Sequence, residues 1–242
     1  MYAVSCENLT KKYKSVTALS GCTLSVDEGE LFGLLGVNGA GKTTLIKILC
    51  GLTSPTEGDA QVLGMSVRSQ IREIKRVVDL SPQETSVAGN LTVKENLEFF
   101  AELYYKEADE RKEAVRRTVE EFSLEEVLSR RAKQLSGGWQ RRLSIAAALI
   151  SRPKVLFLDE PTLGLDVIAR RELWQVIRAI KGKTTIILTS HYLEEVEALC
   201  DRVAIMSKGR VITCGTAAEI TERSGCNSFE EAFVSVVTEG KI

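Results

Sequence analysis

The stretch that decides the fold is Gly36-Val37-Asn38-Gly39-Ala40-Gly41-Lys42-Thr43, which matches the G-x-x-x-x-G-K-[ST] pattern of phosphate-binding loops. It follows the apolar run Leu31–Leu35, which predicts a buried strand, and precedes Thr44–Leu49, whose spacing predicts a helix. Strand, glycine loop and helix therefore occur in the order that such a loop requires. The sequence predicts a site for a nucleoside triphosphate.

Each part of this loop has a physical task in binding phosphates. The glycines let backbone N–H groups point toward the β-phosphate, and the start of the following helix adds a partial positive charge. Lys42 supplies a mobile cation for the β- and γ-phosphates, and the Thr43 hydroxyl can hold Mg²⁺.

Composition and charge narrow the class of protein. The chain has 242 residues, and its 44% hydrophobic content supports a substantial core. Its 32 basic residues are balanced by 33 acidic ones, so no overall field favours nucleic acid, and we expect no nucleic-acid partner. The arginine pairs lie among acids on predicted helices, which indicates solvated faces. These pairs are Arg116-Arg117, Arg130-Arg131 and Arg141-Arg142.

No stretch approaches the ~20 apolar residues that cross a bilayer, and the N-terminus has no apolar secretory segment. The six cysteines form no C-x-x-C pair, and the chain has one histidine, which fits free thiols in a reducing compartment. We therefore expect a soluble, cytoplasmic protein.

The apolar pattern predicts an α/β fold with distinct parts. Short apolar stretches from Tyr2 to Val26 predict a small antiparallel sheet. Helical periodicity then predicts a helical insert at about residues 84–150. The strands Val155–Leu158 and Thr185–Thr189 flank a helical stretch at 169–180, which is a βαβ arrangement typical of a parallel sheet.

Polar residues follow the two predicted parallel strands. Asp159 and Glu160 end the first, and His191 lies beyond the second. Ligands of open parallel sheets bind at the carboxyl ends of strands, so we expect these side chains near the phosphates. Asp159 would hold Mg²⁺ through water, and Glu160 would polarise the attacking water.

A second helix start also suits a phosphate. Ser136 and the following Gly137 and Gly138 leave a helix N-terminus bare enough for close approach of an anion. A Ser-Gly-Gly turn alone is usually a helix cap, but here one chain carries two such helix starts.

The last segment, about residues 228–238, predicts an amphipathic helix. Ser228 and Glu231 have the spacing of a capping box. We expect the helix to dock on the domain rather than on anionic lipid, which would repel its glutamates Glu230, Glu231 and Glu239. Its apolar face comprises Phe229, Ala232, Phe233, Val236 and Val237.

With these motifs in this order and spacing, the chain resembles the ATP-binding subunits of ABC transporters over nearly its whole length. The resemblance implies a P-loop NTPase core of the RecA-like type with a parallel sheet, an N-terminal antiparallel β subdomain and an α-helical insert subdomain. It implies a single ATP-binding domain over residues 1–242. ATP and Mg²⁺ are the cofactors that it implies, and ATP hydrolysis is the reaction.

The resemblance also assigns roles. Tyr13 would stack on adenine, Gln83 would contact Mg²⁺ or water at the hinge of the insert, and Asp166 would lie at a dimer interface. Lys42, Glu160 and His191 would be catalytic, and Thr43, Gln83 and Asp159 would hold Mg²⁺. The implied ATP contacts are Tyr13, Gly36, Val37, Asn38, Gly39, Ala40, Gly41, Lys42, Thr43, Thr44 and Gln83, with Ser136, Gly137 and Gly138 from the second subunit.

Two positions depart from the family's usual residues. Trp139 replaces a common Gln in the Leu135–Gln140 signature motif, and Val37 replaces a frequent Pro or Ser. Neither change removes a phosphate donor, although the large indole can alter packing in the dimer or against the membrane subunit.

In the family, two such domains close head to tail, which implies a second ATP-binding subunit as partner and a homodimer as the simplest case. The resemblance is strongest to subunits of ABC-2 type exporters, which include drug, antibiotic and sodium efflux systems. It therefore implies export through a separately encoded integral-membrane permease, with the chain peripheral on the inner face of the cell membrane.

Other functions stay open from the sequence. An importer ATPase is the main alternative, although importer subunits often carry an extra C-terminal domain. A non-transport ATPase acting on ribosomes or DNA is another, but this chain has one cassette and no long heptad run. A monomeric P-loop kinase or GTPase would not need the Ser136 helix start.

Overall fold

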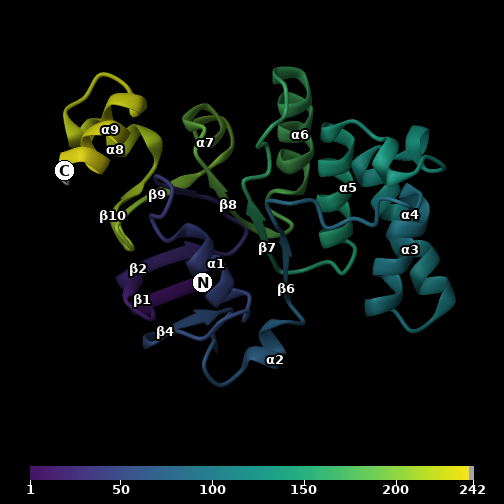
Figure 1. Ribbon diagram of the computed structural model, residues 1–242, viewed down its shortest axis with the longest axis horizontal. Helices are drawn as coiled ribbons and strands as arrows, with labels where there is room; N and C mark the ends of the chain where they lie inside the picture. Colours follow the sequence, from purple (N-terminus) through teal and green to yellow (C-terminus); the bar gives the residue numbers. More distant parts are fainter. Residues whose placement is uncertain (240–242) are drawn as a thin grey trace.

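The computed structural model describes residues 1–239 and has a six-stranded sheet at its centre (Figure 1). Neighbouring strands from β9 to β6 run parallel, and β10 pairs antiparallel with β9 at one edge. The predicted βαβ unit is present, with β7 and β8 as neighbours. In sheet order the strands are β10 (Arg210–Gly215), β9 (Arg202–Ser207), β3 (Leu31–Leu35), β8 (Thr185–Ser190), β7 (Val155–Asp159) and β6 (Val78–Ser81).

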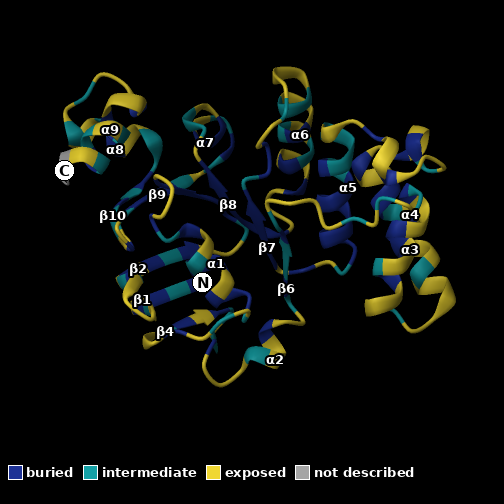
Figure 2. Ribbon diagram, viewed as in Figure 1, coloured by how far each residue is buried: buried dark blue, intermediate teal, exposed yellow. Residues whose placement is uncertain are grey.

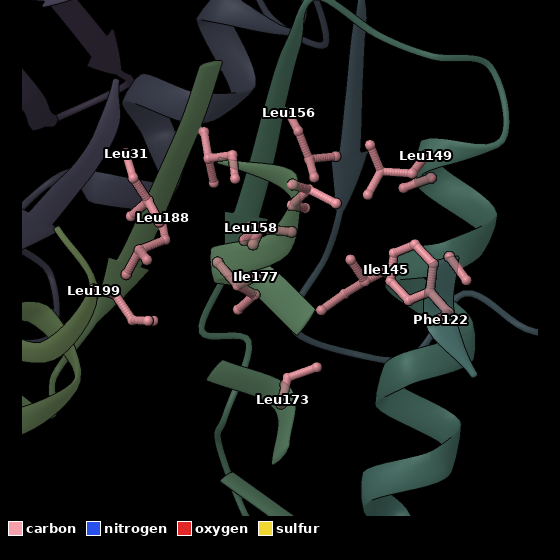
Figure 3. Packing of buried hydrophobic residues seen from close by; sticks show 14 of the residues in the cluster. Leu31, Phe122, Ile145, Leu149, Leu156, Leu158, Leu173, Ile177, Leu188 and Leu199 are labelled. Carbon is pink, nitrogen blue, oxygen red and sulfur yellow. The ribbon is translucent and has the colours of Figure 1, made fainter. Parts of the chain in front are cut away.

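Alternation along the central strands divides the core into two clusters. In β3, Leu31 and Leu35 join one cluster while Phe32 and Leu34 join the other, because successive side chains of a strand point to opposite faces. The first cluster lies against the helices, and Figure 3 shows Leu156 and Leu158 of β7 packed toward them. The second cluster lies against helix α1 and the N-terminal sheet.

The N-terminal sheet is antiparallel, as predicted, in the order β2-β1-β4-β5. Buried and exposed residues alternate along parts of β1 and β2, so one face of this sheet packs against the core and the other is exposed to solvent. The strands are β1 (Tyr2–Tyr13), β2 (Val16–Asp27), β4 (Glu57–Val62) and β5 (Met65–Ser66).

Helices follow the loop, form the insert and cover the sheet. Helix α3 starts at a capping box, in which the Thr92 hydroxyl accepts from the Glu95 amide and the Glu95 carboxylate accepts from the Thr92 amide. The insert helices α3, α4 and α5 lie together at one end of the molecule (Figure 1). The helices are α1 (Lys42–Leu49), α2 (Ile71–Ile74), α3 (Val93–Tyr104), α4 (Ala108–Phe122), α5 (Gly137–Leu149), α6 (Val167–Ile180), α7 (Leu193–Leu199), α8 (Ala217–Ser224) and α9 (Phe229–Glu239), with short 3₁₀ turns at Glu125–Val127 and Ala132–Gln134.

The C-terminal helix α9 docks on the domain. Phe229, Ala232 and Val236 are buried in the same cluster as the helix face of the sheet. The Ser228 hydroxyl accepts from the Glu231 amide, as predicted, but the Glu231 carboxylate accepts from the Asn227 amide, one residue earlier than a capping box requires.

Burial follows the layers, with β7 and β8 buried and much of the outer surface of the helices exposed (Figure 2). Within residues 1–239, no helix combines the length and the apolar character that crossing a membrane would take. All six cysteines are free.

Candidate active site

The glycine loop leaves the end of β3 and turns into α1. At Gly41 the backbone φ is +108°, and a Cβ there would lie 2.7 Å from the Ala18 carbonyl oxygen, so glycine is required for this turn. The buried strand before the loop and the helix after it are both present, as predicted.

Lys42 lies at the first position of α1 with its ammonium turned into the loop. Its Nζ donates to the Gly36 carbonyl oxygen at 2.5 Å. Burial lowers the pKa of Lys42, and the nearby carboxylates of Glu160 and Asp159 oppose this shift. The ammonium is thus bound to one carbonyl and lies near the carboxylates of Asp159 and Glu160. An anionic phosphate can replace that carbonyl as its partner.

A cavity of 310 Å³ opens above the loop and brings together residues from separate stretches of the chain: 16–18, 38–44, Gln83 and Glu160. The β2 residues Val16, Thr17 and Ala18 also line it, and sequence reasoning missed them because the pairing that brings β2 there is long-range. A larger groove of 700 Å³ between α3 and α4 includes none of these residues. The predicted residues that line the cavity are Asn38, Gly39, Ala40, Gly41, Lys42, Thr43, Thr44, Gln83 and Glu160.

Asp159 ends β7 beside the loop. One carboxylate oxygen, Oδ1, accepts from the Thr189 hydroxyl at 2.6 Å, and the other, Oδ2, lies 3.4 Å from the Thr43 hydroxyl. A hydroxyl and a carboxylate side by side are hard oxygen ligands of the kind that Mg²⁺ takes. The residues present therefore fit a magnesium site between Thr43 and Asp159.

Glu160 and His191 contact each other at the ends of neighbouring strands. The Glu160 carboxylate lies 2.7 Å from His191 Nδ1, and the Glu160 amide donates to the Thr189 hydroxyl at 2.9 Å. The His191 ring packs on the Tyr192 ring with centroids 4.2 Å apart, and the Arg170 guanidinium lies 4.6 Å from the Tyr192 ring. The predicted acid and histidine therefore form one hydrogen-bonded pair, and Glu160 is the member of the pair that lines the cavity.

Of two further predicted contacts, Gln83 lines this cavity and Tyr13 lies outside its lining. Gln83 is exposed just after β6, and its backbone carbonyl accepts from Arg141 at 3.1 Å. Tyr13 ends β1 as the register partner of Val16, and Lys11 Nζ lies 4.8 Å from its ring centroid. Tyr13 is 43% exposed and is not among the residues that line the cavity.

The prediction that Arg141 and Arg142 lie on a solvated helix face is wrong. Only 4% of Arg141 is exposed, and its guanidinium binds backbone carbonyls at the ends of β6 and β7. Burial lowers the pKa of Arg141 to about 10, which leaves it charged at neutral pH. Arg142 packs on the Trp139 ring at 4.5 Å and pairs with Glu172, so its side chain is only 12% exposed.

The second helix start lies apart from the cavity of the same chain. Ser136 caps α5 with its hydroxyl toward the Trp139 amide, and none of Ser136, Gly137 and Gly138 lines the 310 Å³ cavity as far as the chain is described. A Cβ at Gly138 would lie 2.9 Å from the Ala169 Cβ, so α5 and α6 pack closely here.

Asp166 caps helix α6. Its Oδ1 accepts from the amides of Ile168 and Ala169, both at 2.9 Å. Next to it the apolar residues Val167 and Ile168 are 61% and 72% exposed. The predicted interface residue therefore lies at an exposed apolar turn.

The arrangement has the parts of a phosphoryl-transfer site. A buried ammonium and a glycine loop can bind phosphate oxygens, a hydroxyl–carboxylate pair can hold a hard cation, and a carboxylate oriented by a histidine can accept a proton from water.

Comparison with known proteins agrees with this geometry. The ABC transporter family model matches residues 19–163. Over 240 residues, 97% of this chain, it is 36% identical to the probable multidrug ABC transporter ATP-binding protein YbhF of Escherichia coli, of whose length it spans 41%. It is 42% identical to the daunorubicin resistance ATP-binding protein DrrA2 of Streptomyces coeruleorubidus, covering 89% of this chain and 67% of that one.

Solved structures agree as well. The ATP-binding subunit of an ABC transporter superposes with a TM-score of 0.84 at 30% identity, covering 97% of this chain and 99% of that one. A dimeric ATP-binding cassette in a post-hydrolysis state with ADP and phosphate superposes with a TM-score of 0.79 at 26% identity, covering 88% and 98%. Motifs, fold and relatives thus coincide, and the chain belongs to the ABC transporter family.

Proposed function

We propose that this chain binds ATP in the glycine-loop cavity and hydrolyses it to power transport, in the direction of export, through a separate membrane permease. The observation that carries the proposal is the meeting of Lys42, Thr43, Asp159 and Glu160 at the ends of β3 and β7. The family match and the ATP-binding relatives support it.

In this proposal the loop amides and Lys42 bind the β- and γ-phosphates. Glu160 accepts a proton from water while the water oxygen attacks the γ-phosphorus. The bond between the γ-phosphorus and the oxygen that leaves with ADP breaks. His191 holds the Glu160 carboxylate through Nδ1, at 2.7 Å, so its direction toward the cavity is set before the water arrives. Bound Mg²⁺ would neutralise phosphate charge, and Thr43 and Asp159 would hold it, with Gln83 nearby.

We further infer that residues 1–242 act as one ATP-binding domain and that two such subunits share each ATP. The Ser136–Gly138 helix start has no place in the cavity of its own chain, and the dimeric relative shows that such cassettes pair. Loss of the γ-phosphate after hydrolysis would weaken the closed dimer, which would turn the chemistry into domain motion.

The cargo would contact the permease and not this chain, so the residues of this chain do not indicate the direction of transport. The direction of export is therefore inferred from relatives. Relatives are named for multidrug transport, daunorubicin resistance and Nod factor export. The chain would lie on the inner face of the membrane through that permease. Reconstitution of the chain with a co-purifying membrane protein in vesicles tests this: ATP-driven movement of cargo away from the ATP side supports export, and movement toward it supports import.

Lys42→Ala tests the ATPase itself. The variant loses the buried ammonium, so we expect kcat/KM for ATP to fall at least about 100-fold. Lys47→Ala is the matched control, because Lys47 is exposed on the same helix and carries the same charge. A phosphate-release assay measures both. Activity of Lys42→Ala equal to that of Lys47→Ala would show that the loop is not the ATP site.

A further inference from the structure

Arg141 uses every hydrogen-bond donor that an arginine has. Its Nε and its two terminal nitrogens carry five N–H groups. Each nitrogen binds backbone carbonyl oxygens, and the five acceptors match the five donors. The acceptors are Pro82, Gln83 at 3.1 Å, Asp159 at 2.7 Å, Glu160 at 2.9 Å and Pro161 at 2.8 Å.

This guanidinium is buried without a direct ion pair. Within residues 1–239, Arg141 forms no salt bridge although only 4% of it is exposed, and the carboxylates of Asp159, Glu160 and Glu195 act on it only at longer range. Burying a charge in this way is unfavourable unless hydrogen bonds replace its water shell. The apolar Leu143 and Ala146 of the same helix are fully buried, so apolar contacts pack α5 beside this charge.

The carbonyls that it binds define an unusual turn. In an extended strand, successive carbonyls point to alternate sides, so one group cannot bind three in a row. Asp159, Glu160 and Pro161 present theirs to one guanidinium because Glu160 has φ +50°, which non-glycine residues adopt rarely.

The same turn directs the Glu160 side chain. Its amide is held by the Thr189 hydroxyl at 2.9 Å, its carbonyl by Arg141 at 2.9 Å, and its carboxylate lies 2.7 Å from His191 Nδ1. Release of the carbonyl side would let Glu160 relax to an ordinary φ and rotate its carboxylate away from the cavity.

We propose that Arg141 is a positioning residue, which holds the backbone turn at Glu160 and thereby keeps the Glu160 carboxylate directed at the attacking water. The proposal rests on the proposed ATPase function. Arg141 does not line the glycine-loop cavity as the described residues define it. It acts through three carbonyls at the end of β7 and ties them to the end of β6.

The test compares Arg141→Gln and Arg141→Lys with Arg116→Gln, a control on α4 whose side chain is 59% exposed. A phosphate-release assay gives kcat and KM for ATP, and circular dichroism with ATP-binding stoichiometry gives the folded fraction. For Arg141→Gln we expect kcat per binding-competent chain to fall at least about tenfold with KM within about threefold, because the Lys42 loop is unchanged. Lysine keeps the charge but lacks the planar fork, so Arg141→Lys should be intermediate.

A folded Arg141→Gln with the kcat of the Arg116→Gln control would overturn the proposal. If Arg141→Gln does not fold, Arg141→Lys decides in the same way. A fall in binding stoichiometry with normal kcat per bound ATP would mean that Arg141 only supports folding, which also overturns it. Absence of ATPase activity in the unmodified chain would instead contradict the proposed function.

Discussion

At the residue scale, the site depends on a side chain whose backbone is held in a disfavoured conformation. Glu160 has φ +50°, which costs about 1–2 kcal/mol for an L-residue. Thr189 and Arg141 bind its amide and carbonyl, so the surrounding hydrogen bonds keep this conformation. Hydrogen bonds of the folded chain thus set the direction of the Glu160 carboxylate before any ligand binds.

The structure brings the loop residues predicted from a local pattern together at one cavity, whereas the predicted Ser136 helix start lies apart from it. Asn38 to Thr44 line the cavity because a glycine loop between strand and helix is specified by adjacent residues. Arg141 was missed because it follows the helix period beside Arg142, and its burial depends on carbonyls 18 to 59 positions away. No local signal distinguishes such an arginine from a surface one.

Glu160→Gln should separate binding from chemistry. The amide keeps the size of the side chain but cannot take the proton of water, so we expect ATP affinity near that of the unmodified chain and turnover reduced at least about 100-fold. Size-exclusion chromatography with ATP and Mg²⁺ should show a persistent dimer. The exposed Glu197→Gln is the control. A monomer that still hydrolyses ATP would exclude Glu160 as the base.

At the scale of elements, period-two alternation in β3, β7 and β8 supplies apolar side chains to both faces of the sheet. The βαβ unit, the helical stretch after β6 and the amphipathic C-terminal helix follow from sequence period, and all are present. The sequence does not predict that the Asn227 amide, rather than the Ser228 amide, donates to the Glu231 carboxylate, because this depends on how the preceding chain approaches α9.

Helix α9 should contribute to stability through one anchor. Phe229 is 3% exposed, so Phe229→Ala should lower the free energy of unfolding by about 3–5 kcal/mol. Val234→Ala, on the same helix at 52% exposure, should change it by less than about 0.5 kcal/mol. Denaturant unfolding measures both. Equal midpoints for the two variants would show that α9 does not add to the core.

At the scale of the whole molecule, the strand order could not be predicted. β3 pairs with β8 and β9, more than 140 positions later in the chain, and this places the glycine loop beside the acids of β7 and the histidine after β8. The sequence predicted that these residues share one sheet edge, whereas their distances depend on long-range pairing. The helix start at Ser136 is left outside this edge, which is the physical reason to expect a second subunit.

The shared site can be tested with two complementary lesions. Lys42→Ala removes the loop cation, and Gly137→Asp puts a carboxylate at the second helix start, where it would repel phosphate. Gly137 suits this change, because a Cβ there meets only Leu165 Cδ2 at 3.8 Å, whereas one at Gly138 would clash with α6. Each lesion should inactivate both sites of its homodimer. In a mixed dimer both lesions fall in one site and leave the other unmodified.

The decisive measurement is ATP retained per isolated mixed dimer. Both variants carry Glu160→Gln to prevent turnover, bear different affinity tags, and are mixed, purified over both tags and passed through a desalting column with labelled ATP and Mg²⁺. We predict one ATP retained per mixed dimer and none in either parent. Mixed dimers that form but retain no ATP would contradict a nucleotide site shared between the Lys42 loop of one subunit and the Ser136 helix of the other.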